Sequence, residues 1–309
     1  MKKTIILTLI LSLLLPTVVL AQDTITLPSA GVTPDNPFYF LDIWGEKIGL
    51  FFAFSHEGKI GKALTYSEEK LAEASALAEK GKPEKLPKAT GPYEAYIALA
   101  NGQTDDLEEE GQSVKDVSTK VAEATSKHLS VLEGVLDKVP EQAKEAIERA
   151  MTVSMNGHNR ALATLAKENP NKATEINLET MMGRLKRAKK MAEEGNTEKA
   201  EEAIENFEKL NTLGQEISQI AQGLGKDTTT VEQLVGKATF HHLEVLAQVY
   251  EKVPDSAKPG IEKAMTNSVK GHEQIVDSLK KKNAIDEIPE EAPIPEELPE
   301  EIKNKILKP

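Results

Sequence analysis

The sequence predicts an all-α protein built from tandem duplicated antiparallel helical bundle units, about four helices each, preceded by an aromatic amphipathic helix. The first observation behind this prediction is an internal repeat: His128 to His158 returns 114 residues later as His242 to His272 without a gap, and 18 of the 31 aligned positions are identical. Such a repeat indicates that the unit is the piece that folds. The second is that apolar residues recur at three- and four-residue spacing, as in amphipathic helices. The third is composition: aromatic residues make up only 4% of the chain, and helix formers are abundant.

The first 21 residues have the composition of a secretory signal peptide. Lys2 and Lys3 precede a mostly apolar run over 5–20, and Val19-Leu20-Ala21 resembles a cleavage site before Gln22. We therefore expect a secreted or periplasmic, extracytoplasmic protein. An uncleaved anchor is the alternative, because the run approaches the ~20 residues that span a bilayer. No second apolar segment is long enough to cross a membrane, so the cleaved chain is expected to have no transmembrane span.

Residues 22–56 are expected to form an extended segment followed by an aromatic helix. The stretch 34–54 holds five of the seven Phe and the only Trp. Helical spacing places the large apolar side chains on one face and Asp42, Glu46 and Lys47 toward the other. Two interpretations follow: a buried plug around which the first unit packs, or an exposed helix that docks on a membrane surface or a partner. The candidate partner-binding residues are Phe40, Trp44, Ile48, Phe51 and Phe52.

The first unit is expected to span residues 57–169. Its first helix follows Ile60 and ends at Gly81, and a second runs over 83–110 with a short turn at Gly91-Pro92, since proline in mid-pattern breaks or kinks a helix. A third helix reaches Val139, and Pro140 opens the fourth, where its fixed φ suits a first turn. Short connections make neighbouring helices antiparallel.

The second unit is expected over 170–282, with helices over 178–194, 197–222, 228–253 and 254–281. Residues 283–309 follow as an acidic segment with five prolines. Such a composition offers little apolar surface to offset the entropy of ordering, so this tail is predicted to be disordered.

The repeated histidines His128, His158, His242 and His272 are the only candidate metal ligands. All four lie on apolar stripes, and helical bundles hold metals in their cores. However, His128 and His158 are expected ~10 Å apart along their hairpin, too far for one site with ~2 Å bonds. We expect core histidines that hydrogen-bond Thr125, Ser154 or a backbone carbonyl, and no cofactor. A metal-binding bundle that uses these histidines remains the alternative.

Charge and motifs restrict the function classes. The formal net charge of −12 argues against nucleic acid and anionic lipid as partners, because both attract clusters of Lys and Arg. Catalytic motifs such as Gly-x-Ser-x-Gly and His-Glu-x-x-His are absent, and without cysteine there is no thiol nucleophile. We expect no enzyme. The expected function is an exported interaction or envelope-associated module with a protein partner in the cell envelope; a periplasmic chaperone-like protein is a further alternative.

The opening motif carries a family resemblance. Pro34-Asp-Asn-Pro-Phe-Tyr-Phe-Leu-Asp42 and the following Trp44, Glu46 and Lys47 resemble a family of exported prokaryotic helical proteins known only as a domain of unknown function, and the likeness extends over most of 34–279. The resemblance implies an extracytoplasmic helical protein without assigned catalytic residues. At Lys70 the resemblance leads us to expect arginine instead.

Overall fold

The computed structural model describes residues 27–307 except residue 287, and this part of the chain contains helices and no strand. The prediction of an all-α fold is therefore confirmed. The predicted signal segment, residues 1–21, lies outside the described residues. The elements, in chain order, are α1 (Tyr39–Phe51), α2 (His56–Glu79), the 3-10 helix η1 (Pro83–Lys85), α3 (Pro87–Glu109), α4 (Lys115–Leu136), α5 (Glu141–Glu168), α6 (Pro170–Glu193), α7 (Thr197–Gly223), α8 (Thr229–Lys252), α9 (Lys258–Lys281) and α10 (Glu300–Leu307).

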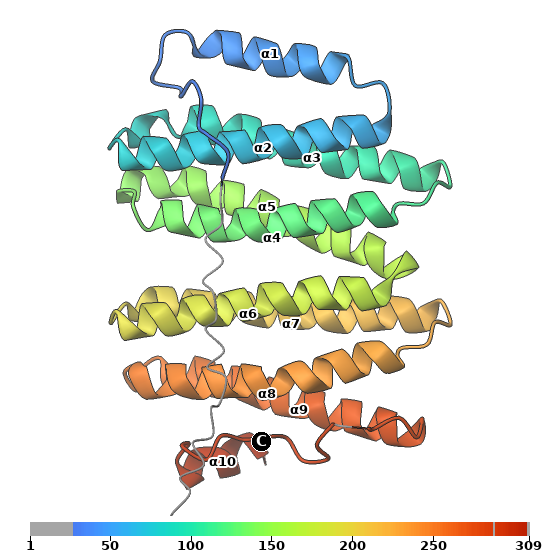
Figure 1. The fold of residues 1–309 in the computed structure, drawn as a ribbon. Helices are drawn as coiled ribbons and strands as arrows, with labels where there is room; N and C mark the ends of the chain where they lie inside the picture. Colours follow the sequence, from blue (N-terminus) through green and yellow to red (C-terminus); the bar gives the residue numbers. More distant parts are fainter. Residues whose placement is uncertain (1–26, 287, 308–309) are drawn as a thin grey trace, which may run out of the picture.

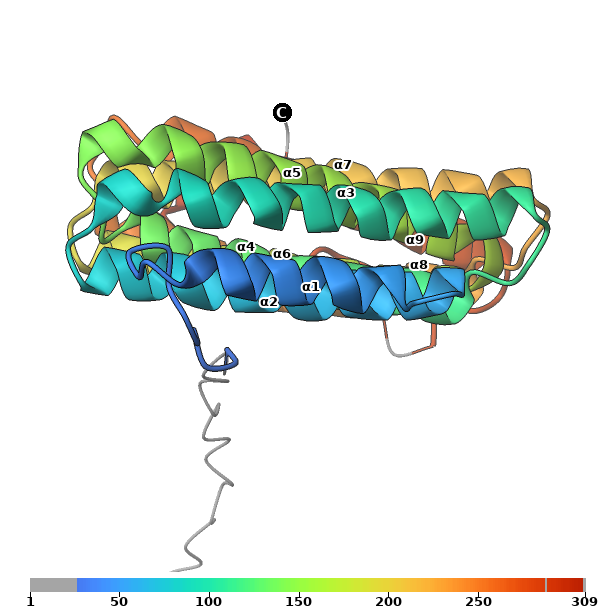
Figure 2. The same cartoon turned by 90° about the horizontal axis from the view of Figure 1, so that it is seen from above.

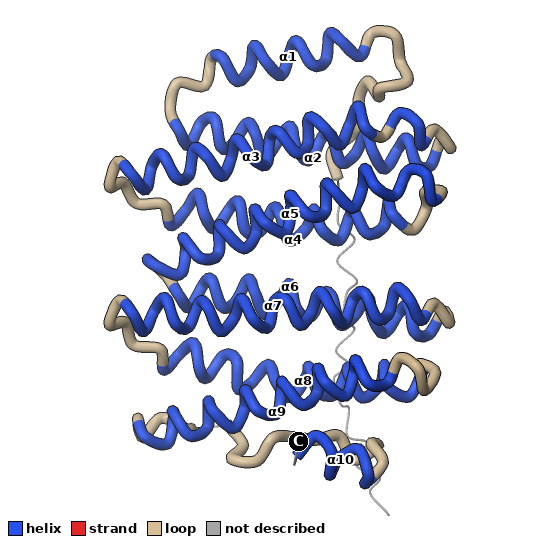
Figure 3. The backbone as a smooth tube through the Cα atoms, turned by 180° about the vertical axis from the view of Figure 1, so that it is seen from behind, coloured by secondary structure: helices blue, strands red, loops and turns tan. Residues whose placement is uncertain are grey.

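Four antiparallel hairpins, α2–α3, α4–α5, α6–α7 and α8–α9, stack in two layers (Figure 1). One layer holds α1, α2, α4, α6 and α8, and the other holds α3, α5, α7 and α9, as the view from above shows (Figure 2). From behind, the second layer lies in front and α10 closes the end opposite α1 (Figure 3). We refer to α2–α5 as unit 1 and to α6–α9 as unit 2.

The hydrophobic core is continuous through both units. One cluster of buried side chains begins at Ile60 and Ala63 on α2, continues through Leu165 on α5 and Phe207 on α7, and ends at Ile306 on α10. A second cluster fills the other part of unit 1 around Tyr93 and Ile147. The units therefore share one core, and each hairpin buries its apolar faces against the next.

Helix ends follow from local sequence. Asn169 and Asn196 cap α6 and α7 by accepting from the backbone N–H groups of Lys172 (3.2 Å) and Lys199 (3.3 Å). Gly81 and Gly195, 114 positions apart, end α2 and α6 at φ of +64° and +73°, which glycine adopts without the steric cost other residues incur.

The expectation of a turn at Gly91-Pro92 is wrong, because α3 passes through both residues without interruption. Proline removes one intrahelical hydrogen bond, the one that would end on the Lys88 carbonyl four residues earlier. The Tyr39 hydroxyl lies 3.3 Å from that carbonyl, and the next residue, Tyr93, is fully buried. A substitute polar contact and tertiary packing together offset the loss.

The disorder predicted for residues 283–309 is also not what the structure shows over the described part of this segment. The described part of this segment crosses the end of unit 2, and its helix α10 packs on α9 (Figure 1). The His272 ring donates through Nε2 to the Pro289 carbonyl at 2.8 Å. The segment is anchored by four widely spaced apolar side chains, Ile288, Leu298, Ile302 and Ile306, each at most 8% exposed. Composition underestimates such anchoring, because few apolar residues suffice on a preformed apolar surface.

Candidate functional site: an aromatic surface on α1

Helix α1 is amphipathic in the reverse sense, with its polar side inside and its apolar side in solvent. At ~100° per residue, its large apolar residues span roughly 120°, opposite Asp42 and Glu46. Lys47 was expected with these two acids but lies beside Phe40 and Trp44 instead. Trp44 is 66% exposed and Phe51 is 75% exposed, whereas Glu46 is 3% exposed. The interpretation of this helix as a buried plug is therefore wrong. We define the aromatic surface by its exposed members: Phe38, Phe40, Leu41, Trp44, Ile48, Phe51, Phe52 and Phe54.

The inward side of α1 is held by a buried cation. Lys70 on α2 is fully buried, and its Nζ lies 2.6 Å from Glu46 Oε1, 2.9 Å from Asp42 Oδ2 and 2.6 Å from Glu73 Oε1. Two phenols complete the cluster. The Tyr96 hydroxyl donates to Glu46 Oε2 at 2.5 Å, and the Tyr39 hydroxyl donates to Glu73 Oε2 at 2.7 Å.

Three carboxyl groups around one ammonium leave the cluster with an excess of acid. Burial opposes the charged form of Lys70, but the adjoining carboxylates of Glu46, Glu73 and Asp42 outweigh it and raise the pKa of Lys70. Burial raises the pKa of Glu73 to about 7, against the opposing effect of Lys70. Charges this deeply buried remain favourable only while each has its partner. The cluster therefore fixes α1 on α2 in one orientation, apolar side outward.

The close approach of α1 to α2 also requires a glycine. A Cβ at Gly49 would meet the Tyr66 hydroxyl of α2 and would lie 3.2 Å from its ring carbon Cζ. Tyr66 in turn packs against Tyr96, with ring centroids 5.6 Å apart. Gly49 thus lets the second half of α1 lie against α2 while Ile48 and Phe51 stay in solvent.

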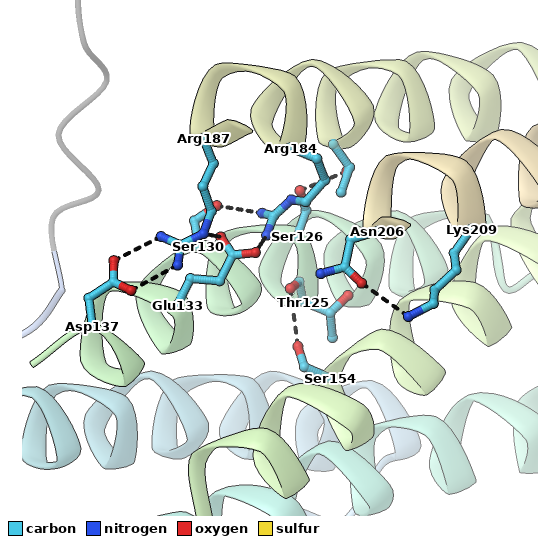
Figure 4. A network of polar contacts seen from close by, with 11 residues as sticks. Thr125, Ser126, Ser130, Glu133, Asp137, Ser154, Arg184, Arg187, Asn206 and Lys209 are labelled. Carbon is cyan, nitrogen blue, oxygen red and sulfur yellow. Dashed lines mark hydrogen bonds and ion pairs between the residues drawn. The ribbon is translucent and has the colours of Figure 1, made fainter. Parts of the chain in front are cut away.

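The same construction joins the two units, with arginine in place of lysine. Arg184 on α6 stands 114 residues after Lys70, is 2% exposed, and pairs with the buried Glu133 of α4. Its Nη2 donates to Ser130 Oγ at 2.8 Å, and Arg187 forms a bidentate pair with Asp137 at 2.9 and 3.0 Å (Figure 4). Helix α1 is therefore fixed on α2 by a buried ion pair, as α4 is fixed on α6. In contrast to α4, which has its hairpin partner α5, α1 has no such helix among the described residues.

The repeated histidines do not come together as a metal site. His128 Nδ1 lies 3.3 Å from the Tyr93 hydroxyl, and His158 Nδ1 donates to the Ala122 carbonyl at 3.0 Å. Burial lowers the pKa of His128 to about 3 and that of His158 to about 4, so both rings are neutral. Within the described part of the chain, no three side chains of His, Asp or Glu are grouped so as to hold a metal ion.

The candidate site was only partly visible in the sequence. The five predicted partner-binding residues all lie in the aromatic surface and are at least 51% exposed. Lys70, Glu73 and Tyr96 were not predicted. The signal for them was the place of Lys70 on the buried stripe of α2, between Ser67 and Leu71, where a charged residue needs a partner from another helix.

Fold and site together define a class: a two-layer stack of helical hairpins that carries an exposed aromatic helix at one end. Residues 31–142, from the segment before α1 to the start of α5, match the family model described as a domain of unknown function (DUF5667). The match includes the aromatic surface and all of the Lys70 cluster. No curated protein and no solved structure matches the chain. None of the described helices combines the length and apolarity needed to cross a membrane.

Proposed function

We propose that the chain is a non-enzymatic, exported module that attaches to the surface of a phospholipid bilayer through the aromatic surface of α1. The single observation that carries the proposal is the reversed amphipathicity of α1, whose polar side is occupied by the Lys70 cluster while its apolar side faces solvent. Aromatic rings on an interfacial helix enter the boundary between lipid headgroups and acyl chains readily.

The size of the surface supports this function. Its five Phe and one Trp are between 58% and 84% exposed. With about 200 Å² for each fully exposed aromatic side chain, they present on the order of 800 Å² of apolar area. The largest apolar patch on an ordinary monomer is about 300–600 Å². Removing even a quarter of this area from water would contribute about 5 kcal/mol at ~25 cal/mol per Å².

Two basic side chains at the edge of the aromatic surface also suit contact with lipid headgroups. Lys47 and Lys88 border a groove with Phe40 and Trp44, and neither forms an ion pair with a described residue.

Vesicle flotation tests the proposal directly. The mature chain is mixed with phosphatidylcholine vesicles, with and without phosphatidylglycerol, and Trp44, the only tryptophan, reports insertion by a blue shift of its fluorescence. A variant with Phe40→Ser, Phe51→Ser and Phe52→Ser keeps Trp44 and the Lys70 cluster and is expected to lose at least tenfold in vesicle affinity. The control Leu224→Ser, Phe240→Ser removes apolar side chains that are 56% and 49% exposed elsewhere and should bind like wild type.

Light scattering in the same buffers distinguishes the other occupants. A monomer that floats with vesicles supports the proposal. A dimer that the triple substitution dissociates, without vesicle binding, would overturn it in favour of a second copy. Suppression of aggregation of unfolded clients by wild type, without vesicle binding, would overturn it in favour of a chaperone-like role.

A further inference from the structure

Unit 2 contains a cavity between its helices. It has a volume of about 310 Å³ and lies among α6, α7, α8 and α9, at the other end of the stack from α1. Its lining includes seven side-chain amides and five hydroxyl groups, but only one carboxylate and neither lysine nor arginine. Cavities of this size are large enough for a small organic ligand.

Comparison of positions 114 residues apart shows how the cavity arises. In unit 1, Ile60, Ala63, Ile97 and Ala100 are at most 1% exposed and fill the space between the helices. In unit 2, smaller or more polar residues stand there: Thr174, Asn177, Asn211 and Gly214, all of which line the cavity.

The glycines facing this space give an independent measure of it. In unit 1 a Cβ added at Gly157 would lie 2.9 Å from Ile97 Cγ2 and 2.8 Å from Asn101 Nδ2. At Gly271, the position in unit 2 that corresponds to Gly157, no atom lies within 4 Å of such a Cβ. The side chains that close the space in unit 1 are therefore absent from its counterpart.

Residues of the cavity wall hold buried polar atoms without partners. Thr174 is 2% exposed and Asn177 is 1% exposed, yet Thr174 Oγ1 and Asn177 Oδ1 have no hydrogen bond to a described residue. Glu232 Oε2 is also unpartnered, while Oε1 of the same carboxylate is held by Thr228 and Lys282, both at 2.8 Å. Native proteins pair nearly all such groups, because each unpaired one costs about 1–3 kcal/mol.

His242 lines the cavity and lacks the hydroxyl partner that its counterpart has in unit 1. In unit 1, the corresponding His128 has the Tyr93 hydroxyl 3.3 Å from Nδ1. Phe207 replaces Tyr93 in unit 2 and keeps the edge-to-face ring contact, with centroids 5.3 Å apart, but supplies no hydroxyl. Neither ring nitrogen of His242, a residue of the cavity wall, hydrogen-bonds a described residue.

We propose that this cavity is a binding site for a neutral polyhydroxylated ligand of mono- to disaccharide size. Amide groups both donate and accept hydrogen bonds, as do the hydroxyl groups of such a ligand. The absence of cationic side chains from the lining disfavours phosphate and carboxylate ligands. Met181, Val231, Val235 and Ile275 offer apolar contacts for the C–H faces of a sugar ring. Thr174, Asn177, Glu232 and His242 would form the hydrogen bonds that are unmade within the protein.

The test is calorimetric titration of the mature chain with maltose, cellobiose and trehalose, and with glucuronate and glucosamine as charged counterparts. The variant Asn177→Ala, Asn211→Ile, Gly214→Ala, called the filled variant below, introduces three of the four unit 1 residues; it removes two lining amides and should narrow the cavity. We expect at least one neutral disaccharide to bind the wild type with a Kd below 10 mM, and the filled variant to lose at least tenfold in affinity while unfolding at the same or a higher temperature.

A matched pair of milder variants covers the case in which the filled variant fails to fold. Thr174→Val removes one unpartnered hydroxyl from the cavity and should weaken binding at least threefold. Thr90→Val removes another buried hydroxyl without a partner from unit 1 and should leave binding unchanged. The proposal is overturned if no neutral disaccharide binds, if the filled variant or Thr174→Val binds like wild type, or if a charged sugar binds more tightly than every neutral one.

Discussion

Replacing Lys70 by methionine should release α1 from the stack without unfolding the rest of the chain. The substitution keeps an unbranched side chain of similar length but leaves the buried carboxylates of Glu46 and Glu73 without their cation. Removing one partner from a buried ion pair typically costs about 3–5 kcal/mol. Helix α1 packs mainly on α2, so the cheapest response is for α1 to leave, which returns Glu46, Asp42 and Glu73 to water.

The magnitude can be read from hydrogen exchange of the α1 amides. A loss of about 3 kcal/mol raises the population of the undocked state by roughly 150-fold, at 1.4 kcal/mol per factor of ten. Amides of residues 39–51 should exchange faster by that factor in Lys70→Met, while amides of α6 and α7 keep wild-type rates. Lys70→Arg is the matched control, because Arg184 occupies the corresponding position against Glu133; it should exchange close to wild type. Unchanged exchange of α1 in Lys70→Met, or equal acceleration in every helix, would refute the reasoning.

Three further predictions concern the core and the tail. Burial lowers the pKa of His158 to about 4, whereas a pKa of ~6.5 is expected in the unfolded chain, so the unfolded state binds the proton first as the pH falls. The stability that the neutral ring contributes is therefore complete above pH ~6.5 and is lost as the pH falls toward 4. At pH 5 it is ~2 kcal/mol smaller. Urea unfolding of His158→Gln at pH 7.5 and 5 should therefore show a smaller acid loss than wild type by about that amount, and parallel pH profiles would contradict a neutral buried ring. Gly157→Ala should destabilise the protein by about 1–3 kcal/mol, because its Cβ would lie 2.8–2.9 Å from Asn101 and Ile97. Gly271→Ala should be neutral or should stabilise by up to ~1 kcal/mol through helix propensity. Equal effects of the two substitutions in thermal melts would contradict the open space beside Gly271. Ending the chain after Lys282 should lower the melting temperature by several degrees and increase binding of a hydrophobic dye, since Ile302 and Ile306 are buried on α9; a truncated chain that melts and stains like wild type would show that α10 is not docked in solution.

Helix positions were predictable from the sequence because local signals specify them. Helical spacing located all eight long helices of the two units, and Gly81, Pro140 and Gly195 stand at or beside their ends as expected. The start of α6 was wrong: it was expected at residue 178, but α6 begins at Pro170. The break expected at Pro92 and the disorder expected after Lys282 failed for a common reason. Both depend on contacts with distant segments, Tyr39 with Lys88 in one case and α10 with α9 in the other, which local composition does not report.

The exposure of α1 could not be predicted from its own pattern, since an amphipathic helix buries whichever face finds a partner. Six large apolar residues on one face favour burial by the hydrophobic term alone. The orientation is decided by Lys70, which lies 24 residues after Glu46 and 28 after Asp42 and is useful to neither until α2 folds back beneath α1. The signal in the sequence was the place of this lysine on the buried face of α2, which requires an acidic partner from another helix.

In the internal repeat, identical positions and changed positions give different kinds of information. Positions that are the same in both units, such as Leu129 and Leu243 or Ile147 and Ile261, are core residues that maintain the helix packing, and they carry no information on how the units differ. Positions that changed are the informative ones: Ile97 and Asn211 occupy the same place in α3 and α7, but the first closes the interior and the second lines a cavity. Asn211 is only partly buried, so an asparagine in place of a core isoleucine here loses about 1.5–3 kcal/mol of apolar burial. A chain that tolerates this substitution together with Gly214, Asn177 and Thr174 in one place gives up stability in unit 2 that unit 1 retains, and a bound ligand that satisfies those polar groups would restore it.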